Sequence, residues 1–157
     1  MHLFFYQTSI GPIGIAETDG RITNLYFGST VTLGDAECRE TALLQEAARQ
    51  VNAYLAGELR EFSLPLAPSG TAFMQAVWQK LCEIPYGKTA SYQDIAIAIG
   101  NPKAVRAVGQ ANHRNPIPII IPCHRVIGSD GKLTGYGGGL ELKKKLLQIE
   151  GYTTFAE

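Results

Sequence analysis

The first part of the chain alternates short apolar segments with turn signals. Residues 3–6, 13–16 and 21–27 are rich in aromatic and aliphatic side chains, and Ile10-Gly11-Pro12 and Asp19-Gly20 separate them. Asp-Gly between two such segments favours a hairpin. Residues 40–55 then repeat apolar side chains on one helical face until Gly57. The pattern predicts a small antiparallel sheet followed by one helix.

The second part has the pattern of short helices. Residues 71–83 are amphipathic, and Cys82 is expected on the apolar face. Ser91 is a candidate N-cap for a helix that ends at Gly100, and Asn101-Pro102 is expected to begin a helix that reaches about residue 112. Two short helices joined by a Gly-Asn-Pro turn predict a helix-turn-helix.

Turn and loop signals complete the second part. Ser129-Asp130-Gly131 predicts a turn between two short strands over residues 127–134, which would form a wing. The glycine-rich residues 135–139 predict a loop whose backbone can approach a ligand, and a last helix is expected from about residue 140 to 150. Prolines 65 and 68, followed by Gly70, indicate a domain boundary. The predicted fold class is therefore α/β (α+β), with a sheet-plus-helix domain over residues 1–69 and a winged helix-turn-helix domain over residues 70–157.

The charge is unevenly distributed although the formal net charge is zero. Residues 1–69 carry four basic and eight acidic side chains, a balance of −4, whereas residues 70–157 carry ten basic and six acidic ones, a balance of +4. This excess favours an anionic partner for the second part, with a solvated surface as the alternative.

Three cysteines are too few and too scattered for a disulfide framework, and none forms a Cys-x-x-Cys pair. The sequence also shows no signal-peptide pattern and no apolar segment of membrane-spanning length. We therefore expect reduced thiols, a cytoplasmic location and no membrane partner.

The strongest chemical signal is Pro122-Cys123-His124-Arg125, which places a thiol beside an imidazole and a guanidinium. Pro118 and Pro122 bracket three isoleucines, so the preceding segment is expected to be extended and stiff. Cationic groups stabilise a thiolate, which makes Cys123 a candidate nucleophile. A structural cysteine is the alternative, because free cysteines are commonly small core residues.

Two features of the helices add to this signal. Glu150 follows Leu146 and Leu147 by four and three residues, so its carboxylate is expected on the buried side, at a helix end that disfavours negative charge. Such a carboxylate needs a partner, for which an imidazole is a candidate; a solvent-facing side chain is the alternative.

The helix around Arg106 mixes small residues with the donors Lys103, Arg106, Gln110 and Asn112. This mixture is typical of a helix pressed against nucleic acid, or of a close helix–helix contact.

Five separated motifs resemble, in order and spacing, those of the O6-alkylguanine-DNA alkyltransferases. They are Ser91-Tyr92-Gln93, the nine residues from Asn101 to Gly109, Asn115-Pro116-Ile117-Pro118, Pro122-Cys123-His124-Arg125-Val126 and Gly138-Gly139-Leu140. The resemblance covers about residues 71–151, and residues 1–69 are compatible with the ribonuclease-H-like domain of the family. It implies a monomer that binds double-stranded DNA, needs no cofactor, and transfers an alkyl group once from guanine O6 to its own cysteine.

The resemblance also implies the roles of the reacting residues. Cys123 would be the acceptor, and His124 would work through a bound water with Glu150 to remove the thiol proton. Asn115 would tie the helix-turn-helix to the site. Arg125 would be a structural arginine beside the cysteine, and we expect it to belong to the DNA- and substrate-binding residues.

The substrate nucleotide must leave the base stack, because its reacting atom is inaccessible inside a duplex. Tyr92 would help to rotate the nucleotide and would hydrogen-bond the guanine, and Arg106 would fill the vacated place. Pro118, Val126 and Tyr136 would line the base pocket. His113 and Arg114 would contact phosphates, with a purely solvated surface as the alternative.

The sequence departs from the family pattern in two places. Gly137 stands where many members have a serine, so only a backbone N–H is available there for the guanine oxygen. The zinc ligands of some members have no match, since Cys38 is isolated and His2 stands alone, and we expect no metal. A lesion-binding module without acceptor activity and a cysteine hydrolase that turns over are the rival hypotheses.

Overall fold

The computed structural model describes residues 1–29 and 34–154, and the contacts divide the chain into two units. Unit 1 contains Met1–Ser69 together with Pro116–Ile120, and unit 2 contains Gly70–Asn115 and Ile121–Glu157. A short segment from the middle of the second part of the sequence thus belongs to the first unit, which the sequence pattern did not predict.

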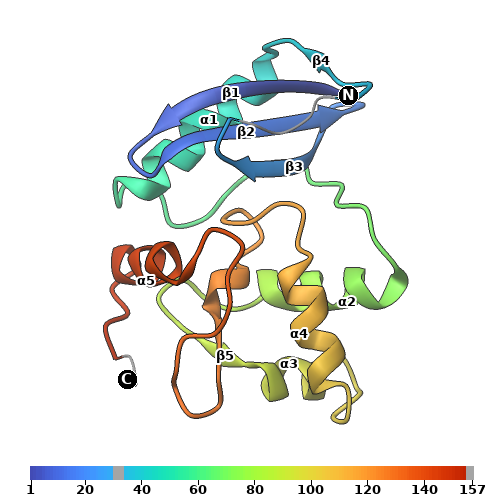
Figure 1. Cartoon of the computed structure of the whole chain (residues 1–157), viewed down its shortest axis with the longest axis vertical. Coiled ribbons are helices and arrows are strands. Elements are labelled where there is room, and N and C mark those ends of the chain that lie inside the picture. Colours follow the sequence, from blue (N-terminus) through green and yellow to red (C-terminus); the bar gives the residue numbers. More distant parts are fainter. Residues whose placement is uncertain (30–33, 155–157) are drawn as a thin grey trace. The chain divides into compact units, whose positions relative to one another are not determined.

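Unit 1 is built on a four-stranded sheet with the strand order β3-β2-β1-β4 (Figure 1). Strands β1 (His2–Thr8), β2 (Gly11–Thr18) and β3 (Arg21–Phe27) are antiparallel neighbours, as the sequence predicts. Strand β4 (Glu37–Cys38) pairs in parallel with β1 and was not predicted, because two residues are too few to show an alternating pattern.

Helix α1 (Ala42–Leu55) covers one face of this sheet (Figure 1). Thr41 caps it by accepting a hydrogen bond from the backbone of Leu44. The side chains of Leu44 and Val51 are fully buried, as is Ile15 in the central strand β2. Burial of each such side chain stabilises the fold by roughly 1.5–3 kcal/mol. The predicted helix is confirmed, and its hydrophobic face forms the core of unit 1.

The segment Pro116–Ile120 adds to unit 1 through its backbone and its isoleucines. The Leu25 N–H donates to the Pro116 carbonyl at 2.9 Å, and the side chains of Ile117 and Ile119 are buried. Ile119 has a φ of +74°, so the prediction of a continuously extended segment before Cys123 is wrong at this residue. A β-branched residue in this region costs roughly 1–3 kcal/mol, and burial of the isoleucines offsets that cost.

Unit 2 is mainly helical, with one short parallel sheet formed by β5 and β6 (Figure 1). Its elements are α2 (Ala72–Cys82), β5 (Ala90–Ser91), α3 (Tyr92–Ala98), α4 (Val105–His113), the 3-10 helix η1 (Cys123–Arg125), β6 (Val126–Ile127) and α5 (Leu140–Ile149). Helices α3 and α4 form the predicted helix-turn-helix and both contact α2. Ser91 caps α3 in a capping box with Asp94.

Three local predictions in unit 2 are wrong. Cys82 is exposed, because it is the last residue of α2. Helix α4 begins at Val105 rather than at Asn101, since a hydrogen bond from Ala104 N–H to the Asn101 carbonyl closes a separate turn. The turn after β6 is closed by the 2.9 Å bond from Gly128 N–H to the Lys132 carbonyl, but β6 pairs with β5 instead of with a second wing strand.

Across residues 1–29 and 34–154, none of the helices combines the length and the apolar character needed to cross a membrane.

Candidate active site

Cys123 is the first residue of the 3-10 helix η1, directly after Pro122. Its N–H donates to the Ile121 carbonyl at 2.8 Å, and the Arg125 N–H donates to the Pro122 carbonyl at 3.1 Å. This tight turn buries three successive side chains, those of Cys123, His124 and Arg125. Cys123 is 5% exposed, so the thiol that the sequence indicates as a candidate nucleophile is buried and does not lie at the surface.

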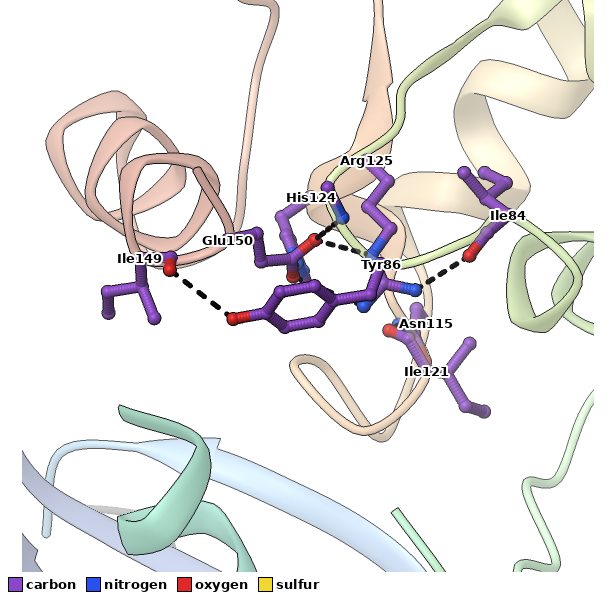
Figure 2. Close-up of polar contacts among 9 residues, drawn as sticks. Ile84, Tyr86, Asn115, Ile121, His124, Arg125, Ile149 and Glu150 are labelled. Carbon is purple, nitrogen blue, oxygen red and sulfur yellow. Dashed lines mark hydrogen bonds and ion pairs between the residues drawn. The ribbon is translucent and has the colours of Figure 1, made fainter. Parts of the chain in front are cut away.

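The structure brings His124, Arg125 and Glu150 together, as Figure 2 shows. Glu150 is the C-cap of α5, and its Oε2 lies 2.6 Å from His124 Nε2. Arg125 Nε donates to Glu150 Oε1 at 2.9 Å, and its second terminal nitrogen donates to Oε2 at 3.2 Å. The backbone N–H of Gly87 also donates to Oε1, at 3.0 Å. These donors hold the carboxylate ionised and fix its orientation.

Arg125 is also held by groups other than Glu150. Its third guanidinium nitrogen donates to the Ile84 carbonyl at 2.7 Å, and its guanidinium carbon lies 5.8 Å from the ring centre of Tyr86. The Tyr86 hydroxyl in turn donates to the Ile149 carbonyl at 3.3 Å (Figure 2). Arg125 therefore supports the Glu150 carboxylate from inside unit 2.

Burial lowers the pKa of His124, although the hydrogen bond and the charge of Glu150 oppose that effect. The imidazole is therefore neutral at pH 7. In a neutral ring whose Nε2 donates to the Glu150 carboxylate, Nδ1 is the basic nitrogen. The arrangement provides a base backed by a carboxylate, in which Glu150 stabilises the imidazolium that forms when Nδ1 accepts a proton.

Burial raises the pKa of the Cys123 thiol to about 11, while a hydrogen bond from Asn115 and the charge of Lys143 act in the opposite direction. The thiol is thus protonated at neutral pH. The sequence favoured His124 and Arg125 as the cations that stabilise a thiolate, and this is wrong: His124 is neutral and Arg125 is bonded to Glu150. The Cys123 thiol therefore needs a base to remove its proton before the sulfur can act as a nucleophile.

Two asparagines connect the end of α4 to the backbone around Cys123. Asn115 Nδ2 donates to the Ile121 carbonyl at 2.8 Å, and Asn112 Nδ2 lies 3.4 Å from the Cys123 carbonyl. Asn112 is buried, so the prediction that it is a surface donor on the helix is wrong. The indole of Trp78 fixes the same helix by donating to the Ala111 carbonyl at 2.8 Å.

Lys143 is a buried residue of the site that the sequence analysis missed. It lies on α5, its side chain is fully buried, and its Nζ lies 2.6 Å from the Val126 carbonyl. Burial lowers its pKa to about 8. Its spacing of three from Leu146 and four from Leu147 was the available signal, because these spacings place residues on one face of a helix.

The remaining predicted residues lie in different environments. Arg106, His113 and Arg114 are exposed on or just after α4. Val126 and Tyr136 are buried, and Gly137 is exposed in the loop before α5. The Tyr92 hydroxyl is hydrogen-bonded to the Thr134 hydroxyl, and burial raises the pKa of Tyr92. Pro118 belongs to the segment that the contacts assign to unit 1. The roles of these residues toward DNA stay predictions.

Two domains of one protein family match successive parts of the chain. Residues 1–68 match the family described as "6-O-methylguanine DNA methyltransferase, ribonuclease-like domain", and residues 72–152 match "6-O-methylguanine DNA methyltransferase, DNA binding domain".

Individual relatives cover nearly the whole chain. A methylated-DNA–protein-cysteine methyltransferase of Methanosarcina barkeri is 50% identical over 153 residues, which are 96% of this chain and 97% of that one. A constitutive enzyme of the same name from Bacillus subtilis is 51% identical, over 93% and 94% of the two chains. The crystal structure of Mycobacterium tuberculosis OGT in complex with DNA is 48% identical, with a TM-score of 0.90 over 96% of this chain and 92% of that one.

Proposed function

Because this chain belongs to the 6-O-methylguanine DNA methyltransferase family, we propose that Cys123 accepts the alkyl group. The protein repairs DNA by transferring an alkyl group from the DNA to a cysteine of its own. Of its three cysteines, Cys38 and Cys82 are exposed, and Cys123 is buried directly before a buried His124 that is bonded to Glu150. This combination of a covered thiol and a carboxylate-backed base carries the assignment.

His124 is the base of the proposed reaction. It takes the Cys123 proton through a bound water, and Glu150 stabilises the positive charge that this places on the ring. The sulfur then attacks the alkyl carbon on guanine O6, so that an S–C bond forms as the O–C bond breaks. The electron pair of the broken bond stays with the guanine, which takes up a proton. Normal guanine and an S-alkyl cysteine are the products.

The product cysteine ends the activity of the molecule. A thioether sulfur is a poor leaving group, and hydrolysis of Cys123 back to a thiol would require that sulfur to leave. Each protein molecule therefore accepts one alkyl group, and repair is stoichiometric.

Access to the target atom requires the nucleotide to leave the stack, at a cost of roughly a few kcal/mol. Arg106 is exposed on α4, where it can fill the place that the nucleotide vacates. Tyr92 hydrogen-bonds the guanine, and the small residues of α4 allow the helix to approach the minor groove closely. Val126 and Tyr136, which are both buried in unit 2, line the base pocket, and the backbone N–H of Gly137 faces the guanine oxygen.

Asn115 and Arg125 support the reacting groups. The Asn115 amide lowers the pKa of Cys123 and bonds the Ile121 carbonyl, which ties the helix-turn-helix to the acceptor. Arg125 keeps Glu150 ionised. Since the acceptor must be a reduced thiol, we place the protein in the cytoplasm, and we expect it to act as a monomer on double-stranded DNA.

The experiment is to incubate the protein with a duplex that contains O6-methylguanine and to measure its mass. One added methyl group on the peptide that contains Cys123 is expected. Cys123→Ala should abolish the gain, and Cys82→Ala, which removes an exposed cysteine of the same unit, should keep it. Unmodified wild-type protein would contradict the proposal in favour of a lesion-binding module. Many product molecules per protein would contradict it in favour of a cysteine hydrolase.

A further inference from the structure

The buried ammonium of Lys143 has an unusual set of partners. Its Nζ lies 2.6 Å from the Val126 carbonyl, 3.1 Å from the Thr134 carbonyl and 3.4 Å from the Thr134 hydroxyl. Among the residues that the structure describes, no carboxylate forms an ion pair with it. Burying an ammonium without a counter-charge is costly, and groups of this kind cluster at functional sites.

The hydroxyl of Thr134 lies between Lys143 and Tyr92. Its oxygen is within reach of Lys143 Nζ and is hydrogen-bonded to the Tyr92 hydroxyl. An ammonium can only donate, so Thr134 accepts from Lys143. Within residues 1–29 and 34–154, the Tyr92 oxygen is then the only side-chain acceptor in contact with the hydrogen of Thr134. Either hydroxyl can donate in this bond, but a hydroxyl that accepts from an ammonium is polarised into a stronger donor, which favours the direction from Thr134 to Tyr92.

The direction of this bond decides what Tyr92 can do. A phenol oxygen that accepts from Thr134 has its own hydrogen free to point elsewhere. No other acceptor for that hydrogen is found in the described part of the chain. Burial raises the pKa of Tyr92, so the phenol keeps its proton at neutral pH. With Thr134 as the donor, Tyr92 is available as a donor to a bound molecule.

We propose that Thr134 is a positioning residue for the repair reaction, oriented by Lys143, which turns the Tyr92 hydroxyl hydrogen toward the guanine. The proposal rests on the function proposed above, in which Tyr92 hydrogen-bonds the base. Negative charge develops on the guanine as the O–C bond breaks, and a donor that is already oriented stabilises that charge without reorganising. Lys143 therefore sets the direction of the hydrogen bonds that run from Lys143 through Thr134 and Tyr92 to the guanine, and Tyr92 is the residue that contacts the base.

The test is the single-turnover rate of methyl transfer from an O6-methylguanine duplex to the full-length protein. Thr134→Val removes the hydroxyl at nearly constant shape, and we expect the rate to fall by at least about tenfold, less than the roughly 10²–10³-fold loss typical of removing a direct donor. Thr134→Ser keeps the hydroxyl and should restore most of the rate. In a Tyr92→Phe background, Thr134→Val should reduce the rate by less than about twofold, because the two changes remove one interaction.

Three results would overturn the proposal: an unchanged rate in Thr134→Val, a Thr134→Ser variant as slow as Thr134→Val, or fully multiplicative losses in the double variant. The last two would indicate that Thr134 acts only through packing. The final extent of methylation of Cys123 in the wild-type protein tests the proposed function separately. Complete methylation with an unchanged Thr134→Val rate removes only the Thr134 proposal, whereas absence of methylation in the wild type removes both.

Discussion

His124 and Glu150 meet at 2.6 Å between Nε2 and Oε2, and neither side chain is exposed to solvent. The two residues come from different elements, η1 and the end of α5, and Arg125 joins them by bonding the same carboxylate. Because both side chains are buried, the charge on Glu150 acts on the ring with little screening. The base strength of His124 therefore depends on Glu150, and the ionisation of Glu150 depends on Arg125.

Replacing Glu150 by glutamine should slow the reaction strongly. The amide keeps the shape of the side chain but cannot compensate the charge of an imidazolium, so we expect the transfer rate to fall by roughly 10²–10⁴-fold. Single-turnover kinetics on an O6-methylguanine duplex measure this change. Glu141→Gln, an exposed position on the same helix, should leave the rate unchanged. A Glu150→Gln rate close to that of the wild type would show that His124 works without the carboxylate.

Replacing Arg125 by methionine should destabilise unit 2. The change leaves the buried carboxylate of Glu150 without its cation, and breaking a buried pair in this way costs roughly 3–5 kcal/mol. Urea unfolding followed by circular dichroism measures the free energy of unfolding. Lys80→Met breaks the surface pair with Glu83 and serves as the control, with an expected change below about 1 kcal/mol. Equal effects of the two substitutions would argue against a supporting role for Arg125.

Cys123 should make the free energy of unfolding depend on pH in the alkaline range. Its pKa is about 11 in the folded protein and near 9 in the unfolded chain, so between these values the folded state holds a proton that the unfolded state has lost. The contribution of the thiol is complete below pH 9 and is lost as the pH rises toward 11.

The measurement compares wild-type protein with Cys123→Ala at pH 8 and at pH 10. We expect the stability of the wild type, relative to that of the variant, to fall by about 1 kcal/mol between these values. Cys38→Ala, at an exposed position of β4, controls for the loss of a thiol as such. A difference that stays constant or grows with pH would contradict the raised pKa.

Replacing Arg106 by alanine should slow alkyl transfer from a duplex much more than alkyl transfer from the free base. The side chain is exposed on α4 and lies outside the His124–Glu150 cluster. We expect the transfer rate from a duplex to drop far more than the rate from free O6-methylguanine base, because only the duplex requires the nucleotide to leave the stack. Arg21→Ala, an exposed arginine of β3, should change neither rate. Equal losses on both substrates would remove Arg106 from the proposed flipping role.

A serine should fit at position 137. A Cβ built on Gly137 has no heavy atom within 4 Å, and the backbone does not require glycine there. We expect Gly137→Ser to change the free energy of unfolding by less than about 0.5 kcal/mol. The added hydroxyl offers a second donor to the guanine oxygen, so the transfer rate should rise, by up to about tenfold. Glycine at the exposed position 135 provides a matched control, since Gly135→Ser should leave the rate unchanged.

Local signals along the chain were enough to predict several of the helices and strands. Alternating side chains and the Asp19-Gly20 turn predicted the first three strands, and Ser91 marked the start of α3. The Cys123-His124 pair and the spacing of Glu150 from Leu147 indicated which residues belong to the site. These signals are readable because hairpins, caps and helical faces depend on residues a few positions apart.

The charge states of the site residues, and the groups to which they bond, became known only from the folded structure. It buried Lys143 with no ion-pair partner among the residues that the structure describes, raised the pKa of Cys123, and paired Arg125 with Glu150 instead of with the thiol. It also turned the chain at Ile119, because the buried isoleucines of that segment pack in unit 1. Desolvation and ion pairing depend on groups that are distant in the chain and close in space, so no local pattern could predict them.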